Sequence, residues 1–369
     1  MERGIVYKGK GKFAYCGWPS VGKLSNGNLI AVWSGDRLKH VCPMGKTVVA
    51  YSRDEGKTWT NPMPVVNTMF DDRDGGVCVK GDKVLITSFN NNYAFQRQDV
   101  RWHKSNEKFI PLIDEYTYLM ADEADESDVG SSITVSEDGG WTYPTRYLVP
   151  ITCPHGPIVL NDGRFCYVGT SFCCANKTEG REYNELEHNR IFVMFSDDGY
   201  NWTEPKILPK SDDDADITEY CEPHVVELNN GELLVHIRVH KKEADGAFGR
   251  MHVYQTISSN GVTEWEKPYD IGVNGAPPHL MRHSSGAIVC VYGDRYRGEI
   301  GEMAIVSRDE GKSWSKPFVI DGTAENGDMG YPCSVELSDG RIFTLYYQHE
   351  KEGEKNYIKY TIWSLDEMK

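Results

Sequence analysis

The sequence lacks a long apolar run, an excess of basic residues and an apolar leader. No stretch of about 18 consecutive apolar residues occurs, which argues against a membrane-spanning helix. The first residues, 1–8, have no apolar core of the kind that marks a secretory signal, so we expect a cytoplasmic protein. Basic residues number 40 against 55 acidic ones, a net charge of −15. This balance argues against nucleic acid or an anionic membrane as a partner.

The sequence also has no Cys-x-x-Cys pair among its ten cysteines. In a reducing compartment we therefore expect free thiols rather than disulfides. Four cysteines lie within three residues of a proline and are expected to pack near a crowded centre: Cys16, Cys153, Cys221 and Cys333. A zinc site is the lesser alternative. We expect no metal and no cofactor.

A short hairpin unit recurs along the chain. Asn230-Gly231 separates two apolar runs, and Asn-Gly at such a place is a strong hairpin signal because the turn needs positive φ. Equivalent turns occur 54 to 82 residues apart, at Gly27, Gly81, Gly163, Gly231, Gly286 and Gly340. No single unit is large enough to bury its own faces. Six copies therefore predict an all-β radial array that closes into a ring.

A second repeat, the Asp box Ser-x-Asp-x-Gly-x-x-Trp, interleaves with the first. Ser52 to Trp59 recurs almost unchanged as Ser307 to Trp314, and variants occupy 136–143, 197–202 and 258–265. In this motif the Ser and Asp side chains accept backbone N–H bonds in a hairpin turn, and the Trp packs beneath. We expect these aspartates to be structural and not catalytic.

The repeats account for nearly all of residues 1–369, which we interpret as one domain. Residues 3–8 are expected to pair with Tyr357–Trp363 and so close the last unit. Residues at about 90–128 form an insertion in the second unit, with an amphipathic helix predicted from Pro111 to Asp128. The insertion either covers a site or contacts another subunit of a homo-oligomer.

Charged and aromatic residues stand where the first strand of a unit begins or its second strand ends. The inner strands of a ring converge on an axis, so these positions predict a shared pocket at one face. The beginnings hold Asp72, Arg73, Asp74, His155, Glu222, His224, His279 and Tyr331, and the ends hold Asp36, Arg37, Arg238, Arg295 and Arg297. The histidines are core residues unless they converge with Asp72 and Asp74, in which case a metal or a histidine-dependent enzyme becomes an alternative.

With the Asp boxes, Glu222-Pro223 … Arg238 and the run from Gly330 to Ser334, the chain resembles the sialidase superfamily over essentially its whole length. The resemblance implies a six-bladed β-propeller with four-stranded antiparallel blades. It implies that Tyr331 is the nucleophile and Glu222 the residue that assists it. It also implies that Arg238 binds the substrate carboxylate.

The same resemblance requires a catalytic acid, for which Asp36 is the first candidate and Asp72 the second. One feature departs from the family, because Gly17-Trp18-Pro19 stands where a carboxylate-binding arginine is usual. Arg37 or Arg73 would have to reach in from a neighbouring loop, and Arg295 or Arg297 would supply the remaining arginine. Asp74, His155 and His224 complete the expected substrate-binding set.

These residues predict an exo-acting glycoside hydrolase that releases a terminal acidic, sialic-acid-like sugar from a glycan. A neutral phenol suits such a sugar, because a carboxylate nucleophile would be repelled by the acid group on the anomeric carbon. Three alternatives remain: a two-carboxylate glycosidase acting on a neutral sugar, a polysaccharide lyase acting on a uronic acid, and a non-catalytic glycan-binding propeller.

Overall fold

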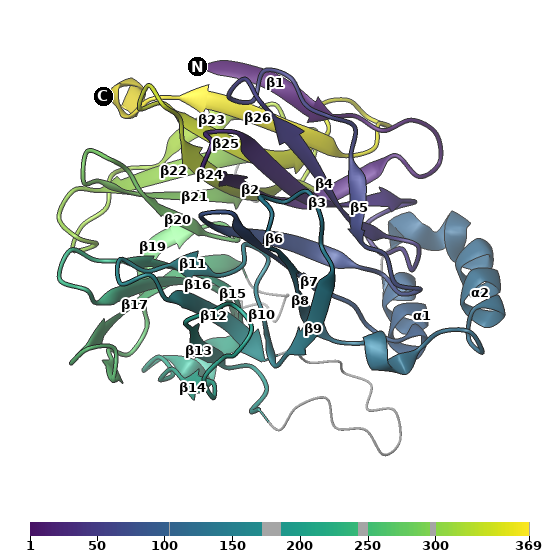
Figure 1. Cartoon of the computed structure of the whole chain (residues 1–369), viewed down its shortest axis with the longest axis horizontal. Coiled ribbons are helices and arrows are strands. Elements are labelled where there is room, and N and C mark those ends of the chain that lie inside the picture. The colour runs from purple at the N-terminus through teal and green to yellow at the C-terminus, as the bar shows by residue number, and fades with distance from the viewer. Residues whose placement is uncertain (103, 172–185, 243–249, 296–299, 369) are drawn as a thin grey trace.

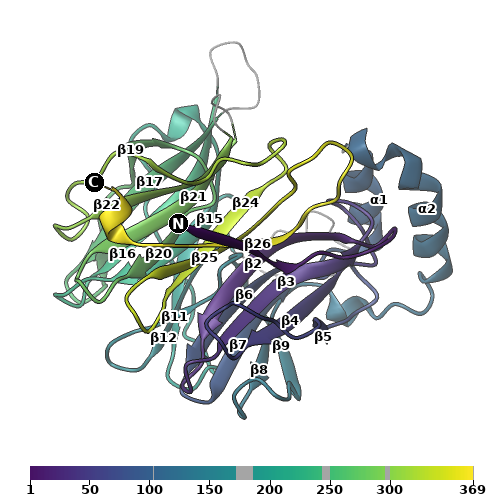
Figure 2. The ribbon, with the colours of Figure 1, turned by 90° about the horizontal axis from the view of Figure 1, so that it is seen from above.

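The computed structural model describes residues 1–102, 104–171, 186–242, 250–295 and 300–368. These residues form six sheets of antiparallel strands, arranged as the blades of a propeller (Figures 1 and 2). The predicted six-bladed β-propeller is therefore confirmed.

The blades follow one another in chain order, and each runs from an inner to an outer strand. Blade 1 contains β2 (Tyr15–Lys23), β3 (Leu29–Arg37), β4 (Lys46–Ser52) and β5 (Met63–Val66). Blade 2 contains β6 (Arg73–Lys80), β7 (Lys83–Phe89), β8 (Ser131–Ser136) and β9 (Thr145–Val149). Blade 5 contains β20 (His279–Arg282), β21 (Ile288–Asp294), β22 (Gly301–Ser307) and β23 (Phe318–Asp321).

Blades 3 and 4 each have one strand position divided between two short strands. In blade 3, β10 (Ile151–Thr152) and β11 (Ile158–Val159) both pair with β12 (Phe165–Ser171), which is followed by β13 (Ile191–Ser196) and β14 (Lys206–Ile207). In blade 4, β15 (Ile217–Glu227) and β16 (Leu233–Lys241) precede β17 (Met251–Ser259), and both β18 (Glu264–Trp265) and β19 (Tyr269–Asn274) pair with β17.

The ring closes through the N-terminal strand. Blade 6 contains β24 (Gly330–Glu336), β25 (Ile342–Gln348) and β26 (Tyr357–Trp363), and its outer strand is β1 (Glu2–Tyr7). β1 runs antiparallel to β26, with Arg3 opposite Thr361. The predicted closure is confirmed, and it covers an edge of β26 that would otherwise be unpaired.

The core lies between neighbouring blades. Leu29 and Trp33 of blade 1 pack with Phe343 and Leu345 of blade 6 in one buried cluster. Central strands are buried on both faces, which explains why β3 and β25 read as nearly continuous apolar runs rather than as alternating ones.

The Asp boxes are turns between the third and fourth strands. In the first box Ser52 Oγ accepts a hydrogen bond from Gly56 N at 2.8 Å, and Asp54 Oδ1 accepts one from Thr58 N at 2.8 Å. The same pair of bonds recurs at Ser307 and Asp309. Since the strands are antiparallel, these turns lie at the opposite end of each blade from the beginning of its inner strand. The predicted structural role is confirmed.

Two α-helices lie between β7 and β8, where the insertion was predicted. They are α1 (Tyr93–Trp102) and α2 (Ile110–Leu119), and they stand together at one side of the ring (Figures 1 and 2). The predicted helix ends earlier than expected, at Leu119, and α1 was not predicted. Short 3-10 helices cover Lys104–Phe109, Glu126–Asp128, Asp214–Asp216 and Leu365–Met368.

Within the described residues no helix has both the length and the apolar character needed to span a membrane. The eight cysteines that the structure describes are buried and free of disulfides.

Candidate active site

Four inner strands share a backbone irregularity that directs one side chain into the mouth of the ring. Trp18, Asp74, Glu222 and Tyr331 have φ angles of 53°, 52°, 46° and 54°. In each strand the pairing register shifts at this point. Bulges re-aim side chains, and non-glycine residues at positive φ concentrate at functional sites. The bulges of blades 1, 2, 4 and 6 thus bring together residues that are far apart in the sequence.

Tyr331, Glu222 and Arg238 form one contact. Tyr331 Oη donates a hydrogen bond to Glu222 Oε1 at 2.5 Å, and Arg238 Nη1 donates one to Glu222 Oε2 at 2.5 Å. Arg238 Nη1 also lies 3.5 Å from Tyr331 Oη. The pairing of β15 with β16 sets Arg238 opposite Cys221, the residue before Glu222. The hairpin therefore holds the carboxylate and the guanidinium at the same strand edge.

The pKa values of Tyr331 and Glu222 are shifted in opposite directions. Burial, followed by the charge of Glu222, raises the pKa of Tyr331 well above 10.0. Burial alone would raise the pKa of Glu222 as well, but Arg238 and the hydrogen bond from Tyr331 outweigh it and lower that pKa. The site therefore holds a neutral phenol against an ionised carboxylate, which is placed to accept the phenol proton.

Asp74 is the second carboxyl group of the site. Burial, only partly opposed by the charge of Arg73, raises the pKa of Asp74 to about 7. Its Oδ1 is buried and has no hydrogen-bond partner among the described residues. A carboxyl group that keeps its proton near neutral pH can act as a general acid.

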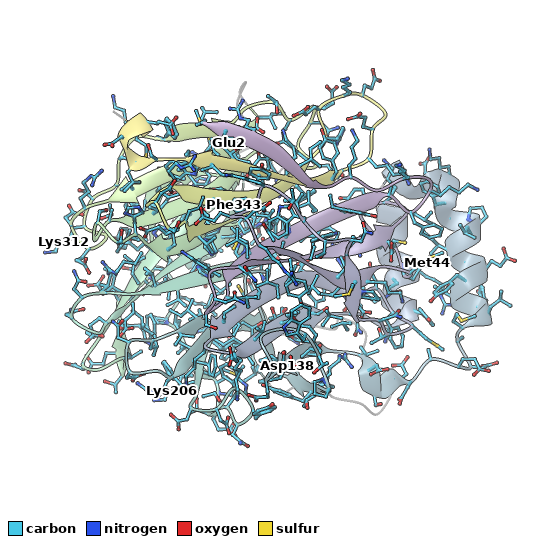
Figure 3. The ribbon with its side chains drawn as sticks, turned by 45° about the horizontal axis from the view of Figure 1, so that its top comes forward. Glu2, Met44, Asp138, Lys206, Lys312 and Phe343 are labelled. Carbon is cyan, nitrogen blue, oxygen red and sulfur yellow. The ribbon has the colours of Figure 1, made fainter. Side chains whose placement is uncertain are left out.

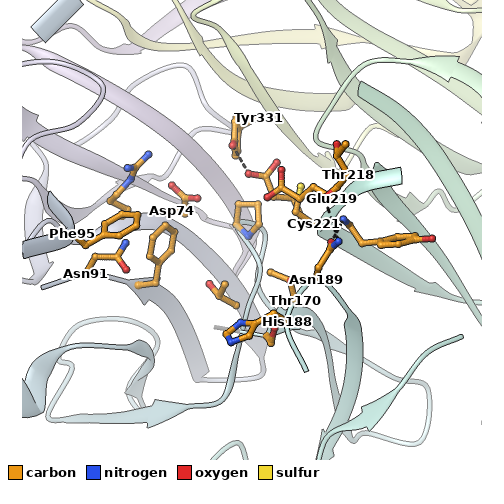
Figure 4. Close-up of a pocket in the computed structure, with 17 residues that line it drawn as sticks. Asp74, Asn91, Phe95, Thr170, His188, Asn189, Thr218, Glu219, Cys221 and Tyr331 are labelled. Atoms are coloured by element: carbon orange, nitrogen blue, oxygen red, sulfur yellow. Dashed lines mark hydrogen bonds between the residues drawn. The ribbon is translucent and has the colours of Figure 1, made fainter. Parts of the chain in front are cut away.

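These groups open into a pocket of about 560 Å³ between blades 2, 3 and 4. Figure 4 shows Asp74 on one side, Glu219 and Cys221 on the other, and Tyr331 at the head of the pocket. The remaining walls are mixed apolar and polar, from Arg73, Phe89, Asn91, Phe95, Thr152, Pro154, Thr170, Ser171, His188, Asn189, Thr218, Tyr220 and Glu222. A sugar ring with several hydroxyl groups is matched by such a wall.

Neither predicted catalytic acid lies in this pocket. Asp36 is exposed and lines a separate groove with Tyr7 and Trp33, so the expectation for Asp36 is corrected. Asp72 is fully buried and accepts hydrogen bonds from Thr68 and Asn90. Burial raises the pKa of Asp72 to about 6 although those bonds oppose the shift. Asp72 stabilises the loop that carries Thr68, whereas Asp74 lines the pocket.

Of the predicted arginines, Arg73 lines the pocket and Arg37 lies buried outside it. Arg37 is fully buried and donates two hydrogen bonds to Asp71, at 2.5 and 2.9 Å. Arg37 therefore does not line the pocket, contrary to the prediction. Arg73 lines the pocket. The guanidinium carbons of Arg37 and Arg73 lie 4.7 and 4.4 Å from the centre of the Trp18 ring, at the place where the family arginine is missing.

Arg295 lies beside Tyr331 but outside this pocket. Its guanidinium carbon is 5.6 Å from the centre of the Tyr331 ring, and its Nε donates to Met329 O at 3.0 Å. Arg297 lies outside the described residues. Of the predicted arginines, Arg238 and Arg73 are thus the ones placed at the Tyr331 pocket.

The three predicted histidines gather beneath the pocket rather than in its wall. The rings of His224 and His279 stack with centroids 4.3 Å apart, and His155 lies 5.1 Å from His279 and 6.5 Å from Tyr331. Burial lowers the pKa of each, that of His224 to about 3. These neutral rings pack the channel, so the substrate-binding role predicted for His155 and His224 is corrected.

Sequence reasoning missed Glu219 and His240. Glu219 lines the pocket two positions before Cys221, and His240 Nε2 accepts a hydrogen bond from Arg238 Nε at 2.9 Å. The sequence signal for these two residues is the alternation of side chains along β15 and β16. Residues two apart lie on the same face of a sheet, so Glu219 lies on the face of Cys221 and His240 on the face of Arg238.

Among the described residues, one group has the composition of a metal site. The ligand atoms of Glu219, Cys221 and His240 lie within 4.8 Å of one another. Arg238, however, donates to the His240 nitrogen that would bind the ion, and its positive charge opposes a cation there. The group fits the support of Arg238 better than it fits a metal.

The chain was compared with known proteins. A protein of unknown function from Dyadobacter fermentans superposes with a TM-score of 0.73 at 18% identity, covering 98% of each chain. The intramolecular trans-sialidase of Ruminococcus gnavus gives a TM-score of 0.66 at 16% identity, covering 99% of this chain and 98% of that one. The NanB sialidase of Streptococcus pneumoniae gives 0.66 at 12% identity, covering 99% of this chain and 71% of that one.

At these identities the solved structures establish a shared sialidase-like propeller fold. No curated protein sequence matches the chain at a significant level. Residues 117–344, more than half of the chain, match the model of the BNR repeat-like domain. On this match the chain belongs to the family of proteins with a BNR repeat-like domain.

Proposed function

We propose that the chain is an exo-acting, retaining glycoside hydrolase that releases a terminal acidic, sialic-acid-like sugar from a glycan. The observation that carries the proposal is the 2.5 Å hydrogen bond from Tyr331 Oη to Glu222 Oε1. A buried phenol with a raised pKa is a poor nucleophile by itself and needs an adjacent base. Glu222 is that base.

In the first step the Tyr331 oxygen forms a bond to the anomeric carbon while its proton passes to Glu222. The bond from the anomeric carbon to the leaving oxygen breaks, and Asp74 gives its proton to that oxygen. Arg238 contacts both Glu222 and Tyr331 and stabilises the negative charge as it moves between them.

In the second step water attacks the anomeric carbon of the glycosyl-tyrosine. Asp74, now ionised, accepts a proton from the water, and Glu222 returns its proton to the Tyr331 oxygen as that bond breaks. The two inversions give net retention, and both carboxyl groups regain their starting states.

The test uses Tyr331→Phe, which removes the nucleophilic oxygen and leaves the ring packing in place. On a panel of aryl glycosides and glycans that includes sialosides, we expect the wild type to release an acidic sugar and the variant to lose at least about 10³-fold in kcat. Mass spectrometry after rapid quenching should find the sugar attached to the peptide that contains Tyr331. Retained turnover in Tyr331→Phe would exclude a tyrosine nucleophile.

A two-carboxylate glycosidase acting on a neutral sugar is a second candidate, favoured by the opposite pKa shifts of Asp74 and Glu222. Pairs of carboxyl groups with separated pKa values carry out acid and base roles. In this scheme Tyr331→Phe remains largely active and Glu222→Gln is inactive. The same panel distinguishes the two schemes by the sugar released.

A further inference from the structure

A second pocket, of about 550 Å³, lies beside the Tyr331 pocket and shares no lining residue with it. Its walls come from blades 1, 5 and 6 and from the insertion that precedes α2. Two of its residues, Tyr347 and Arg295, contact the ring of Tyr331, with separations of 6.0 Å between ring centroids and 5.6 Å from guanidinium to ring centre. The Tyr331 ring therefore stands between the two pockets.

Three basic side chains of the second pocket, Lys39, Lys108 and Arg295, form no salt bridge within the described residues. Among the described residues, Arg295 donates from Nε to the Met329 carbonyl, and its buried Nη2 has no hydrogen bond. Its charge acts on the carboxylates of Asp328 and Glu302 without forming a salt bridge. Lys355 lies close by, and burial together with the charges of Lys39 and Lys108 lowers its pKa. These cations cluster although the chain has a net charge of −15. Cations held close together repel one another, and a bound anion relieves that repulsion.

The acidic groups of the second pocket are already engaged by the protein. Asp328 accepts hydrogen bonds from Tyr15 at 2.9 Å and from Tyr347 at 3.3 Å, and it lies 3.3 Å from His40 Nδ1. Glu354 pairs with Lys8 at 2.9 Å. The last titratable group, His349, is bonded to Asn326 and Asn356. Although burial opposes the shift, His40, Tyr15 and Arg295 lower the pKa of Asp328 to about 2, so Asp328 stays ionised. Its single negative charge is outnumbered by Lys39, Lys108 and Arg295, so the pocket keeps a net positive charge.

We propose that this second pocket binds a small anionic group (a carboxylate, sulfate or phosphate) through Lys39, Lys108 and Arg295. Ammonium and guanidinium groups form the strongest hydrogen bonds with such oxygens. Lys108 belongs to the insertion, so in this proposal the insertion supplies part of the binding site. The anion is carried by the glycan beside the bond that is cleaved, and this second part of the inference rests on the proposed function.

Binding of inorganic sulfate tests the first part. The full-length protein is titrated with sodium sulfate in a calorimeter at constant ionic strength, and we expect saturable binding of one ion. In Lys39→Gln/Lys108→Gln the affinity should fall at least about tenfold, since two charge-assisted bonds are lost. The matched control is Lys312→Gln, an exposed lysine far from the helices (Figure 3), which should bind like the wild type.

Parallel titrations with phosphate and acetate identify which anion the pocket prefers. The proposal fails if no anion binds saturably, or if the double variant binds as well as the wild type. Tyr331→Phe should bind sulfate as the wild type does, so a wrong assignment of the nucleophile leaves this result unchanged.

Kinetics test the second part. On the glycoside that the wild type hydrolyses, the double variant should show a KM about tenfold higher with kcat little changed, the pattern of lost ground-state binding. Normal KM in a variant that no longer binds sulfate would separate the anion site from the glycan and overturn the second part.

Discussion

Asp74 and Asp36 show how the backbone position of an aspartate decides whether its side chain lines the pocket. Both are aspartates near a blade entry, and both have positive φ. Asp74 occupies a bulge of an inner strand and turns into the pocket, whereas Asp36 ends the second strand of its blade and remains exposed. Burial raises the pKa of Asp74 to about 7, as the proposed acid role requires, whereas Asp36 does not line the Tyr331 pocket.

A pH profile should report the acid role of Asp74. The protonated form is the active one, so kcat/KM should fall as pH rises through about 7, the pKa of Asp74. In Asp74→Asn this limb should disappear, and turnover of an unactivated glycan should fall by roughly 10²–10⁴-fold. A nitrophenyl glycoside, whose leaving group needs no proton, is the control and should lose far less. Equal losses on both substrates would assign Asp74 to binding instead.

The Arg37–Asp71 pair makes a separate prediction about stability. Both side chains are buried, so Arg37→Met leaves an uncompensated carboxylate and should lower the free energy of unfolding by about 3–5 kcal/mol. Replacing both partners, as Arg37→Met/Asp71→Leu, should recover much of the loss because no buried charge remains. Chemical denaturation measures both. A double variant no more stable than the single one would point to packing of Arg37 on Trp18 as its main contribution.

At the scale of the element, a substitution in an Asp box should lower stability without lowering activity. Ser307 is buried, and its Oγ accepts the Gly311 N–H at 2.8 Å. Ser307→Ala leaves that N–H without a partner and should cost about 1–3 kcal/mol of stability. This turn of blade 5 lies at the face of the ring opposite the strand beginnings that carry Tyr331, so kcat at 25 °C should not change. Denaturation and steady-state kinetics on the same preparation check both statements, and a large loss of kcat would link the box to the site.

At the scale of the whole molecule, closure depends on one short strand. Deleting residues 1–8 removes β1 and exposes the edge of β26, so the midpoint of thermal unfolding should fall and the protein should aggregate. The matched control is Ile5→Thr, which changes an exposed side chain and keeps the backbone pairing. Calorimetry and light scattering measure the two outcomes. A truncated chain that melts like the wild type would show that blade 6 holds without β1.

The sequence by itself determined the features that repeat or act locally. Turn glycines and Asp boxes indicate hairpins, and six hairpins that recur every 54 to 82 residues predict a ring because no single unit can bury its faces. Tyr331, Glu222 and Arg238 were found in the same way: each marks the entry or end of a repeated strand, and the ring brings such positions to one mouth. The α1 helix was missed because polar and charged residues dominate its segment, which therefore reads as a loop even though its few apolar residues recur with a helical period.

Only the tertiary structure decided which polar residues line the pocket. Arg37 and Asp71 are 34 residues apart and in different parts of the ring, so spacing along the chain does not reveal that they neutralise each other. The exchange of Asp36 for Asp74, the burial of the three histidines and the second pocket depend likewise on bulges and on contacts between blades. A side chain's direction at a bulge is fixed by its neighbours in space, and the order of residues in the chain does not contain it.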